Sequence, residues 1–396
     1  MPPTSRSQGP KKSVVFVATL LTVITIVACT RDPFDRDRPV ILYEGEYTYQ
    51  PVIAEGPIAS FNVSMDATGR MGLAAVTDLH EVTVLENAAG AWVEAGSITA
   101  SAINGMSVDI APGALGAWWV LASASDVGMR LYRVGGAGDS SLTIPLFSST
   151  PWDSVGAVLA SDPAGRPVAF LKALGLRLVR ATLADTGWAL DEVLQTTSTA
   201  VAWDAYISPS GVEHLVYQRV STSFSSYRKV NSDSIHASEI PQAGVYPALA
   251  VTADETAYVA GSMNEYRNLR LWRWAPEYTA DEENPWIAEV LPAETIDPFT
   301  GRFAVAIASD ETPHVLLAAY DDTERISIIW ASRNPDFYGI NWTAERVAAD
   351  IPWRGFADRR RGFRLMLDAF DAPHFFFLSA ASDILDSTLY EAVPRP

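Results

Sequence analysis

The sequence has little cysteine and few basic residues. Its 396 residues include one Cys, which excludes an internal disulfide framework and any metal site built from several thiolates. Only 29 Lys plus Arg stand against 47 Asp plus Glu, so the formal net charge is −18. Because phosphate backbones select Lys and Arg, we predict no nucleic-acid partner. With 48% hydrophobic residues the chain can still bury cores, which excludes an intrinsically disordered protein.

The first thirty residues have the pattern of an export signal. Arg6, Lys11 and Lys12 precede an apolar stretch over residues 14–28. At about fifteen residues this stretch is shorter than the roughly twenty that a membrane-spanning helix needs. A positive segment followed by a short apolar run and small residues is typical of a secretory signal peptide.

The single cysteine comes directly after this run. The residues Ile26-Val27-Ala28-Cys29 resemble the bacterial lipobox, in which small residues precede a Cys that becomes the lipidated N-terminus. The resemblance implies a signal peptide over residues 1–28, lipidation of Cys29 and a charged, Pro-rich tether over residues 29–39. Each buried methylene of an acyl chain contributes about 0.8 kcal/mol of membrane affinity.

The lipobox resemblance also implies a location. Thr30 follows the Cys, and in bacterial lipoproteins this leans toward the outer membrane where the host has one. We therefore expect an exported, lipid-anchored protein of the bacterial cell envelope. A signal-anchor helix and ordinary secretion with cleavage near Ala28 are the alternatives.

After the tether, one theme of about fifty residues recurs seven times. An apolar strand leads to an acidic or glycine-containing turn, then to two further strands, and often to a Trp that opens a fourth. The separation of Gly69 from Trp92 equals that of Gly165 from Trp188. The turns lie at residues 66–69, 112–116, 162–165, 208–211, 254–256, 310–312 and 368–371.

The repeat predicts an all-β fold. Segments such as Met129–Arg133 and Leu269–Arg273 alternate polar and apolar residues, which is the pattern of half-buried strands, and no sustained helical periodicity occurs. Four short antiparallel strands per unit are typical of a propeller blade. We predict a seven-bladed β-propeller over residues 40–396, closed by a strand at residues 40–49 that pairs with the last blade, and we expect a monomer.

These blades resemble bacterial seven-bladed propellers of the sialidase-like (BNR-type) superfamily, whose units read D-x-x-G, then P-H-V, then G-x-W. The resemblance covers residues 40–396 and implies an architecture rather than a reaction. The segments at residues 64–69 and 161–165 depart from the sialidase box in spacing. They also fall between the first and second strands, whereas that box lies between the third and fourth.

Repeated residues at equivalent positions are expected to serve packing. His214, His314 and His374 share one repeat position, so they should be spread around the ring rather than converge on one ion. The turn acids should accept backbone N–H groups, and the outer-strand Trp residues should pack between blades. We expect no cofactor, with a structural Ca²⁺ at an acidic turn as an alternative.

Residues that break the repeat are better candidates for ligand binding. Several aromatic and arginine side chains fall in the loops that join one blade to the next, where they would ring one mouth of the axial funnel. Aromatic faces stack on ligands, and Arg binds carboxylates bidentately. The candidates are Trp152, Trp203, Tyr246, Phe299, Arg302, Trp353, Arg354 and Arg359. The alternatives are that the aromatics plug the channel and that residues 358–361 form a solvated run.

We favour a membrane-anchored binding or scaffold module for an envelope protein or glycan, without catalysis. The alternative is a carbohydrate-active enzyme, a glycoside hydrolase or lyase, with its site in the funnel. Hydrolysis would need two carboxylates about 5 to 9.5 Å apart. The candidates are Asp153, Asp204, Asp297 and Asp358.

Overall fold

The computed structural model describes most of the chain after the tether. It covers residues 40–395, with gaps at residues 57, 79–80, 89, 100–102, 125–127, 137, 146–151, 153–156, 174–176, 194–199, 220–224, 232–233, 242, 244–246, 264–266, 276–284, 292–302, 321–324, 335–341, 353–362 and 380–386. The predicted signal peptide, tether and lipidation site at Cys29 lie outside the described residues. Among the residues described, no helix is long and apolar enough to cross a bilayer.

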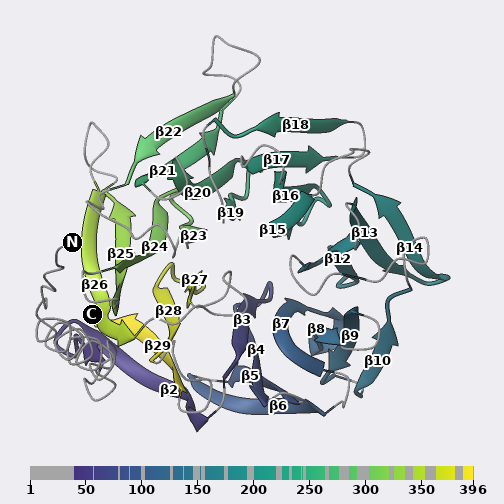
Figure 1. Ribbon diagram of the computed structural model, residues 1–396, viewed down its shortest axis with the longest axis horizontal. Coiled ribbons are helices and arrows are strands. Elements are labelled where there is room, and N and C mark those ends of the chain that lie inside the picture. The colour runs from purple at the N-terminus through teal and green to yellow at the C-terminus, as the bar shows by residue number, and fades with distance from the viewer. Residues whose placement is uncertain are drawn as a thin grey trace, which may run out of the picture. The chain divides into compact units, whose positions relative to one another are not determined.

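Seven antiparallel sheets are arranged in a ring, which confirms the predicted propeller and its blade number (Figure 1). Within each sheet the chain runs from the innermost strand outward, each strand pairing with the next, except that the N-terminal strands β1 (Ile41–Leu42) and β2 (Tyr47–Gly56) add to the outer edges of blades six and seven. Blades one to three consist of β3 (Ser60–Met65), β4 (Met71–Asp78), β5 (Glu81–Ala88) and β6 (Ala91–Thr99); β7 (Ile103–Pro112), β8 (Trp118–Ala124), β9 (Gly128–Val134) and β10 (Ser140–Thr143); and β11 (Val158–Ser161), β12 (Pro167–Ala173), β13 (Arg177–Ala184) and β14 (Gly187–Glu192).

The remaining four blades repeat this order. A single short 3₁₀ turn, η1 (Ala114–Gly116), is the one helical element that the described residues contain. Blades four to seven consist of β15 (Ala200–Ile207), β16 (Glu213–Arg219), β17 (Ser225–Val230) and β18 (Ile235–Glu239); β19 (Ala248–Val251), β20 (Ala257–Met263), β21 (Arg267–Trp274) and β22 (Trp286–Val290); β23 (Phe303–Ile307), β24 (Pro313–Tyr320), β25 (Arg325–Arg333) and β26 (Trp342–Pro352); and β27 (Phe363–Leu367), β28 (Pro373–Leu378), β29 (Ser387–Pro394) and β2 (Tyr47–Gly56).

The N-terminal strand closes the ring, but the predicted single strand is divided in two. β2 (Tyr47–Gly56) pairs with β29 and supplies the fourth strand of blade seven, as expected. β1 (Ile41–Leu42) pairs instead with β26, as a fifth strand of blade six. The break has a local cause, because the amides of Glu46 and Tyr47 both donate to the Tyr43 carbonyl and turn the chain between the two blades.

The hydrophobic core is divided among the blade interfaces. The described residues form seven buried apolar clusters, and each cluster joins side chains of two adjacent blades. The interface of blades six and seven is one example, where Tyr47 packs edge-on against Phe375 at 5.9 Å between ring centroids. A chain of this length is thereby stabilised by many small cores in place of one large one.

The outer-strand Trp residues pack between blades, as predicted. Trp92 of blade one meets Phe376 of blade seven edge-on at 5.8 Å, and its indole N–H donates to Glu391 of the same blade. Trp286 of blade five donates to Ser238 of blade four. In both cases the Trp contacts the preceding blade, so each outer strand ties its blade to its neighbour.

The turns between first and second strands are closed by the acids predicted for them. In blade one, Asp66 Oδ1 accepts the amide hydrogens of Thr68 and Arg70, at 2.9 and 3.1 Å. Asp162 and Asp368 accept the equivalent amides of their own turns. These carboxylates are therefore committed to Asx-type turns.

The fourth position of these turns lies close to the preceding blade in several blades, although an added Cβ on Gly211 would meet open space. Its backbone has a positive φ in every blade, with Gly in blades one to four and an acid in blades five to seven. A Cβ placed on Gly165 would lie 2.5 Å from the backbone nitrogen of Ala114 in blade two. Only Gly fits at this point, because an added Cβ would meet backbone at a distance that real Cβ atoms do not show.

Candidate functional site

A cavity of about 260 Å³ lies on the ring axis and is lined by the inner strands of all seven blades. The blades place one residue each at an equivalent point of this wall, four positions before the first residue of the turn that follows. Three of these seven residues are apolar and four are polar. They are Asn62, Asp109, Val158, Asp204, Ala248, Ala304 and Arg364, in blade order.

Three of the polar groups form a chain across blades seven, one and two. Arg364 Nε donates to Asn62 Oδ1, and Asn62 Nδ2 donates to Asp109 Oδ1. Asp109 is 5% exposed, and its Oδ2 accepts the Leu159 amide of blade three at 2.8 Å. Each of these bonds links two blades, so the chain of bonds connects four consecutive blades beside the axis.

Asp204 makes the same kind of link between blades four and five. Its Oδ2 accepts the Leu249 amide at 2.9 Å. Burial raises the pKa of Asp204 to about 6, and the neighbouring Asp109 charge raises it further, whereas the Leu249 amide and the Arg364 guanidinium oppose the rise. Near neutral pH this carboxyl is close to its titration point, unlike an ordinary surface aspartate.

The predicted rim residues are mostly outside the described part of the chain. Trp152 is 2% exposed and packs in the core shared by blades two and three, with its backbone bridged to Ala173. Its ring is thus held between blades and is not turned toward solvent. The backbone of Trp203 belongs to β15, but its side chain is not described. The remaining candidates lie outside the described residues: Tyr246, Phe299, Arg302, Trp353, Arg354 and Arg359.

Of the four candidate carboxylates, the structure describes one. Asp204 lines the axial cavity, but from within strand β15 and not from the inter-blade loop expected for it, while Asp153, Asp297 and Asp358 lie outside the described residues. Asn62, Asp109 and Arg364 were not among the residues predicted from the sequence. The signal that could have found them is their position, since each stands where other blades carry Val or Ala at the same distance before the turn.

The three repeated histidines lie in three different blades, as predicted. Each is the second residue of a second strand: His214 in β16, His314 in β24 and His374 in β28. Within the described part of the chain, no group of three His, Cys, Asp or Glu residues is placed to hold a metal ion. The ring geometry accounts for this, because equivalent positions in separate blades point to separate interfaces.

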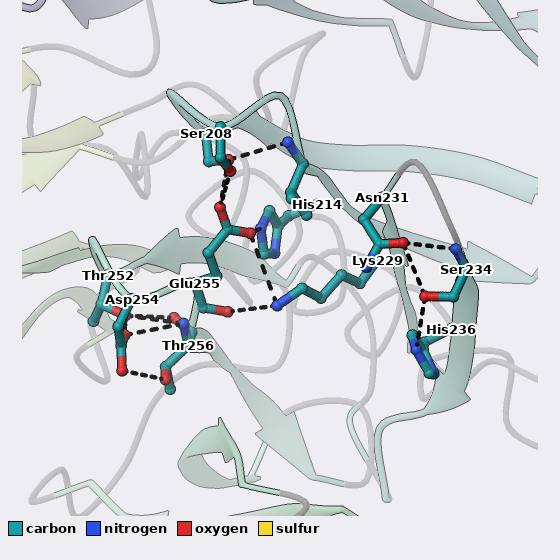
Figure 2. A network of polar contacts seen from close by, with 12 residues as sticks. Ser208, His214, Lys229, Asn231, Ser234, His236, Thr252, Asp254, Glu255 and Thr256 are labelled. Carbon is teal, nitrogen blue, oxygen red and sulfur yellow. Dashed lines mark hydrogen bonds and ion pairs between the residues drawn. The ribbon is translucent and has the colours of Figure 1, made fainter.

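Glu255, at the fourth position of the turn between the first and second strands of blade five, organises a second polar cluster (Figure 2). It belongs to blade five but accepts the hydroxyls of Ser208, at 2.6 Å, and Ser210 in blade four. Its other oxygen lies 3.2 Å from His214 Nε2 and 3.8 Å from Lys229 Nζ. Partial burial acts to raise the pKa of Glu255, but the hydrogen bonds from Ser208, Ser210 and His214 together hold it below its usual value.

His214 is the buried centre of this cluster. Its side chain is fully buried, and Nδ1 pairs with the Tyr227 hydroxyl at 2.7 Å. Burial lowers the pKa of His214 to about 4, with the Glu255 bond opposing and the Lys229 charge adding to the shift. The imidazole is neutral at physiological pH. The serines donate to the carboxylate and not to the imidazole, so the cluster joins two blades and does not have the arrangement of a Ser–His nucleophile pair.

Comparisons with known proteins agree on the fold. No protein-family model matches this chain, and no curated protein matches its sequence. Among solved structures it is similar to the RRP9 WD40 repeats, with a TM-score of 0.53 and 10% identity over 90% of this chain and 100% of that chain. It is also similar to the WD40 domain of SCAP from fission yeast, with a TM-score of 0.51 and 8% identity over 88% of this chain and 98% of that one.

A sialidase is among the structural neighbours. The NanB sialidase from Streptococcus pneumoniae matches with a TM-score of 0.49 and 10% identity, over 87% of this chain and 70% of that chain. A likeness this weak supports no inference about function. The chain is a seven-bladed β-propeller, an architecture that serves binding modules as well as enzymes.

Proposed function

We propose that this protein is a non-catalytic binding module, held at a bacterial membrane by an acylated Cys29, whose propeller presents a face to an envelope protein or glycan. One observation carries the proposal. The carboxylates of Asp109 and Asp204 on the axis each hold the backbone amide of the next blade. Carboxylates that hold strands of adjacent blades together are suited to a rigid scaffold. Their removal would weaken the contact between blades, which is the effect expected of structural residues.

Exposed apolar side chains favour a protein as the partner. Phe370 and Leu115, at the same turn position in blades seven and two, are 90% and 85% exposed. The turn of blade one lies between them: a Cβ on Gly69 would lie 3.5 Å from Ala369, and one on Gly116 would lie 3.7 Å from Arg70. Leu115 also has a positive φ of 59°, a conformation that costs a non-glycine residue about 1 kcal/mol or more.

Binding and anchoring are tested separately. Photo-crosslinkers placed at Leu115 and Phe370 in living cells should capture the same protein, and Phe370→Ser should abolish its capture without lowering thermal stability. Cys29→Ala should move the protein from membrane fractions to the soluble fraction. Continued sedimentation of Cys29→Ala with membranes would refute the anchor, and equal capture by wild type and Phe370→Ser would refute the binding surface.

A carbohydrate-active enzyme is the second candidate. Two acids, Asp109 and Asp204, line the same cavity, and the pKa of Asp204 is raised to about 6 by burial, as a general acid requires. The test is hydrolysis of a panel of nitrophenyl glycosides by the purified protein. Turnover that Asp204→Asn abolishes, with the fold intact, would favour the enzyme over the binding module.

A further inference from the structure

A second pocket, of about 390 Å³, lies between blades six and seven, beside the turns that join the first and second strands of these blades. It shares no residue with the axial cavity. Its aromatic wall comes from the second and third strands of blade six, and its polar wall comes from the first turns of blades six and seven. The lining residues that matter here are Asp310, Thr312, His314, Trp330, Ser332 and Asp371.

The aromatic wall is a flat platform made of two rings. Trp330 Nε1 donates to His314 Nδ1 at 3.2 Å, and the two ring planes differ by only 6° with their centroids 5.8 Å apart. Because an indole N–H lies in the plane of its ring, this bond holds the imidazole edge to edge with the indole. Phe375 of blade seven packs against Trp330 at 5.5 Å, which fixes the platform from the neighbouring blade.

The hydrogen bond also sets the chemistry of the imidazole. Nδ1 accepts the indole hydrogen, so it carries no proton, and the neutral ring carries its proton on Nε2. Burial lowers the pKa of His314, although the charges of Asp310 and Asp371 oppose the shift. The ring is therefore neutral at physiological pH, and the platform as a whole carries no charge.

The polar wall consists of hydroxyls and carboxylates. Asp310 Oδ1 accepts the Thr312 amide at 2.9 Å, and Asp371 accepts the amide and hydroxyl of Ser309. A carboxylate offers about four acceptor sites, so both acids keep acceptor capacity after these bonds. Arg333 also lines the pocket, and its guanidinium donates to Glu289 at 3.0 Å, so that carboxylate balances its charge.

A flat, uncharged aromatic surface beside hydroxyl and carboxylate acceptors matches one class of ligand. The axial C–H groups of a pyranose form an apolar face that covers an aromatic ring, while its ring hydroxyls need acceptors at the edge. Pockets that bind small molecules combine an aromatic wall with a few placed polar groups in this way, and begin at about 300 Å³. Two carboxylates repel an acidic sugar and accept hydrogen bonds from an ammonium.

We propose that this pocket binds a neutral or amino pyranose, stacked on the Trp330–His314 platform and hydrogen-bonded to Asp310 and Asp371. The site goes beyond the binding face proposed above. Asp371 adjoins Phe370 in one turn, but sugar binding depends on Trp330 and protein capture on Phe370, so the two proposals are tested by different variants and readouts. It lies at one blade interface, so it holds a terminal sugar or a short oligosaccharide.

The test uses the purified chain and methyl pyranosides of glucose, galactose, mannose, N-acetylglucosamine and glucosamine, with methyl glucuronide as the acidic comparison. Saturation-transfer NMR and calorimetry should show millimolar binding of at least one neutral or amino sugar. Binding of the glucuronide should be at least about tenfold weaker, equivalent to about 1.4 kcal/mol of charge repulsion. No binding of any neutral or amino sugar at about 20 mM, a concentration well above the weakest useful affinity, would overturn the proposal.

Three variants locate the binding. Trp330→Phe keeps an aromatic ring but removes the N–H that aligns His314, so affinity should fall about fivefold or more, close to 1 kcal/mol. Trp92→Phe removes a comparable indole at the next interface around the ring, between blades seven and one. Trp92 is not part of the pocket lining, so this change should leave affinity unchanged. Equal effects of these two changes would place the sugar elsewhere and refute the site.

Asp310→Asn tests the charge argument without risk to the core, because Asp310 is exposed and an Asn oxygen can still accept the Thr312 amide. Removal of one carboxylate should reduce the difference in affinity between the neutral sugar and the glucuronide. An unchanged preference in a folded Asp310→Asn variant, or equal binding of both sugars by the wild type, contradicts the proposed recognition.

Discussion

Replacement of Asp204 by Asn should change the pH dependence of stability in a direction that the structure fixes. Burial raises the pKa of this carboxyl to about 6, against 3.8 for the unperturbed group. The folded state therefore binds the proton more tightly than the unfolded state does. The resulting stabilisation is fully present below about pH 3.8 and is lost as the pH rises through about 6.

The magnitude follows from the two pKa values. Each pKa unit between the folded and unfolded states corresponds to about 1.4 kcal/mol. The free energy of unfolding of the wild type therefore falls by about 3 kcal/mol, through this group, between strong acid and mild alkali. About 2 kcal/mol of that loss falls between about pH 4.5 and about pH 8. Asn does not titrate, so Asp204→Asn should gain about 2 kcal/mol relative to wild type over this interval.

The assay is denaturant unfolding of wild type and variant at a series of pH values in this range, followed by Trp fluorescence. Titrating groups remote from Asp204 act equally in both proteins, so their contributions cancel in the difference. Asp204→Ala serves as the control. It removes the acceptor of the Leu249 amide and should cost a further 1 to 3 kcal/mol or so at every pH, with the same slope as Asp204→Asn. The free energy of unfolding of Asp204→Asn minus that of wild type should rise with pH. A value that stays constant, or falls as the pH rises, would refute the predicted role of the Asp204 pKa.

Two further sites test how the ring is held together. In thermal unfolding, Gly165→Ala should destabilise the protein more than Gly211→Ala does. Both glycines have a positive φ, which costs another residue about 1 to 2 kcal/mol, but only at Gly165 would the new Cβ meet backbone, 2.5 Å away. Equal losses of stability would contradict that contact. Tyr47→Ala should cost about 3 to 5 kcal/mol and Tyr47→Phe about 1 kcal/mol, since only the first opens the core beside Phe375; a small loss for Tyr47→Ala would mean that β2 does not close the ring.

The repeat was predictable because its signals are local. A strand with one buried face alternates residue by residue, and an Asp at the start of a turn accepts amides two and four residues later, so both leave a mark in a short window of sequence. Asp66 and Asp162 show that mark in the same form. The outer-strand residues Trp92 and Trp286 were also identified from the sequence, since each lies at the start of the fourth strand of its repeat.

The N-terminal strand shows where local signals end. Residues 40–49 were predicted to form one strand that pairs with the last blade, and this pairing is confirmed from Tyr47 onward, in β2. The turn at Tyr43 and the transfer of Ile41–Leu42 to blade six depend on where the edge of β26 lies. That edge belongs to a part of the chain about three hundred residues away, and nothing in the segment itself reports it.

The sequence alone determined the all-β class, the seven units and the residues of their turns, because periodicity and turn chemistry act between near neighbours. Tertiary structure alone decided which side chains meet. Arg364 and Asn62 are 302 residues apart yet share a hydrogen bond on the axis, and Asp371 reaches Ser309 across an interface. Closure of the ring brings such residues together, since it sets distances in space that separation along the chain does not encode.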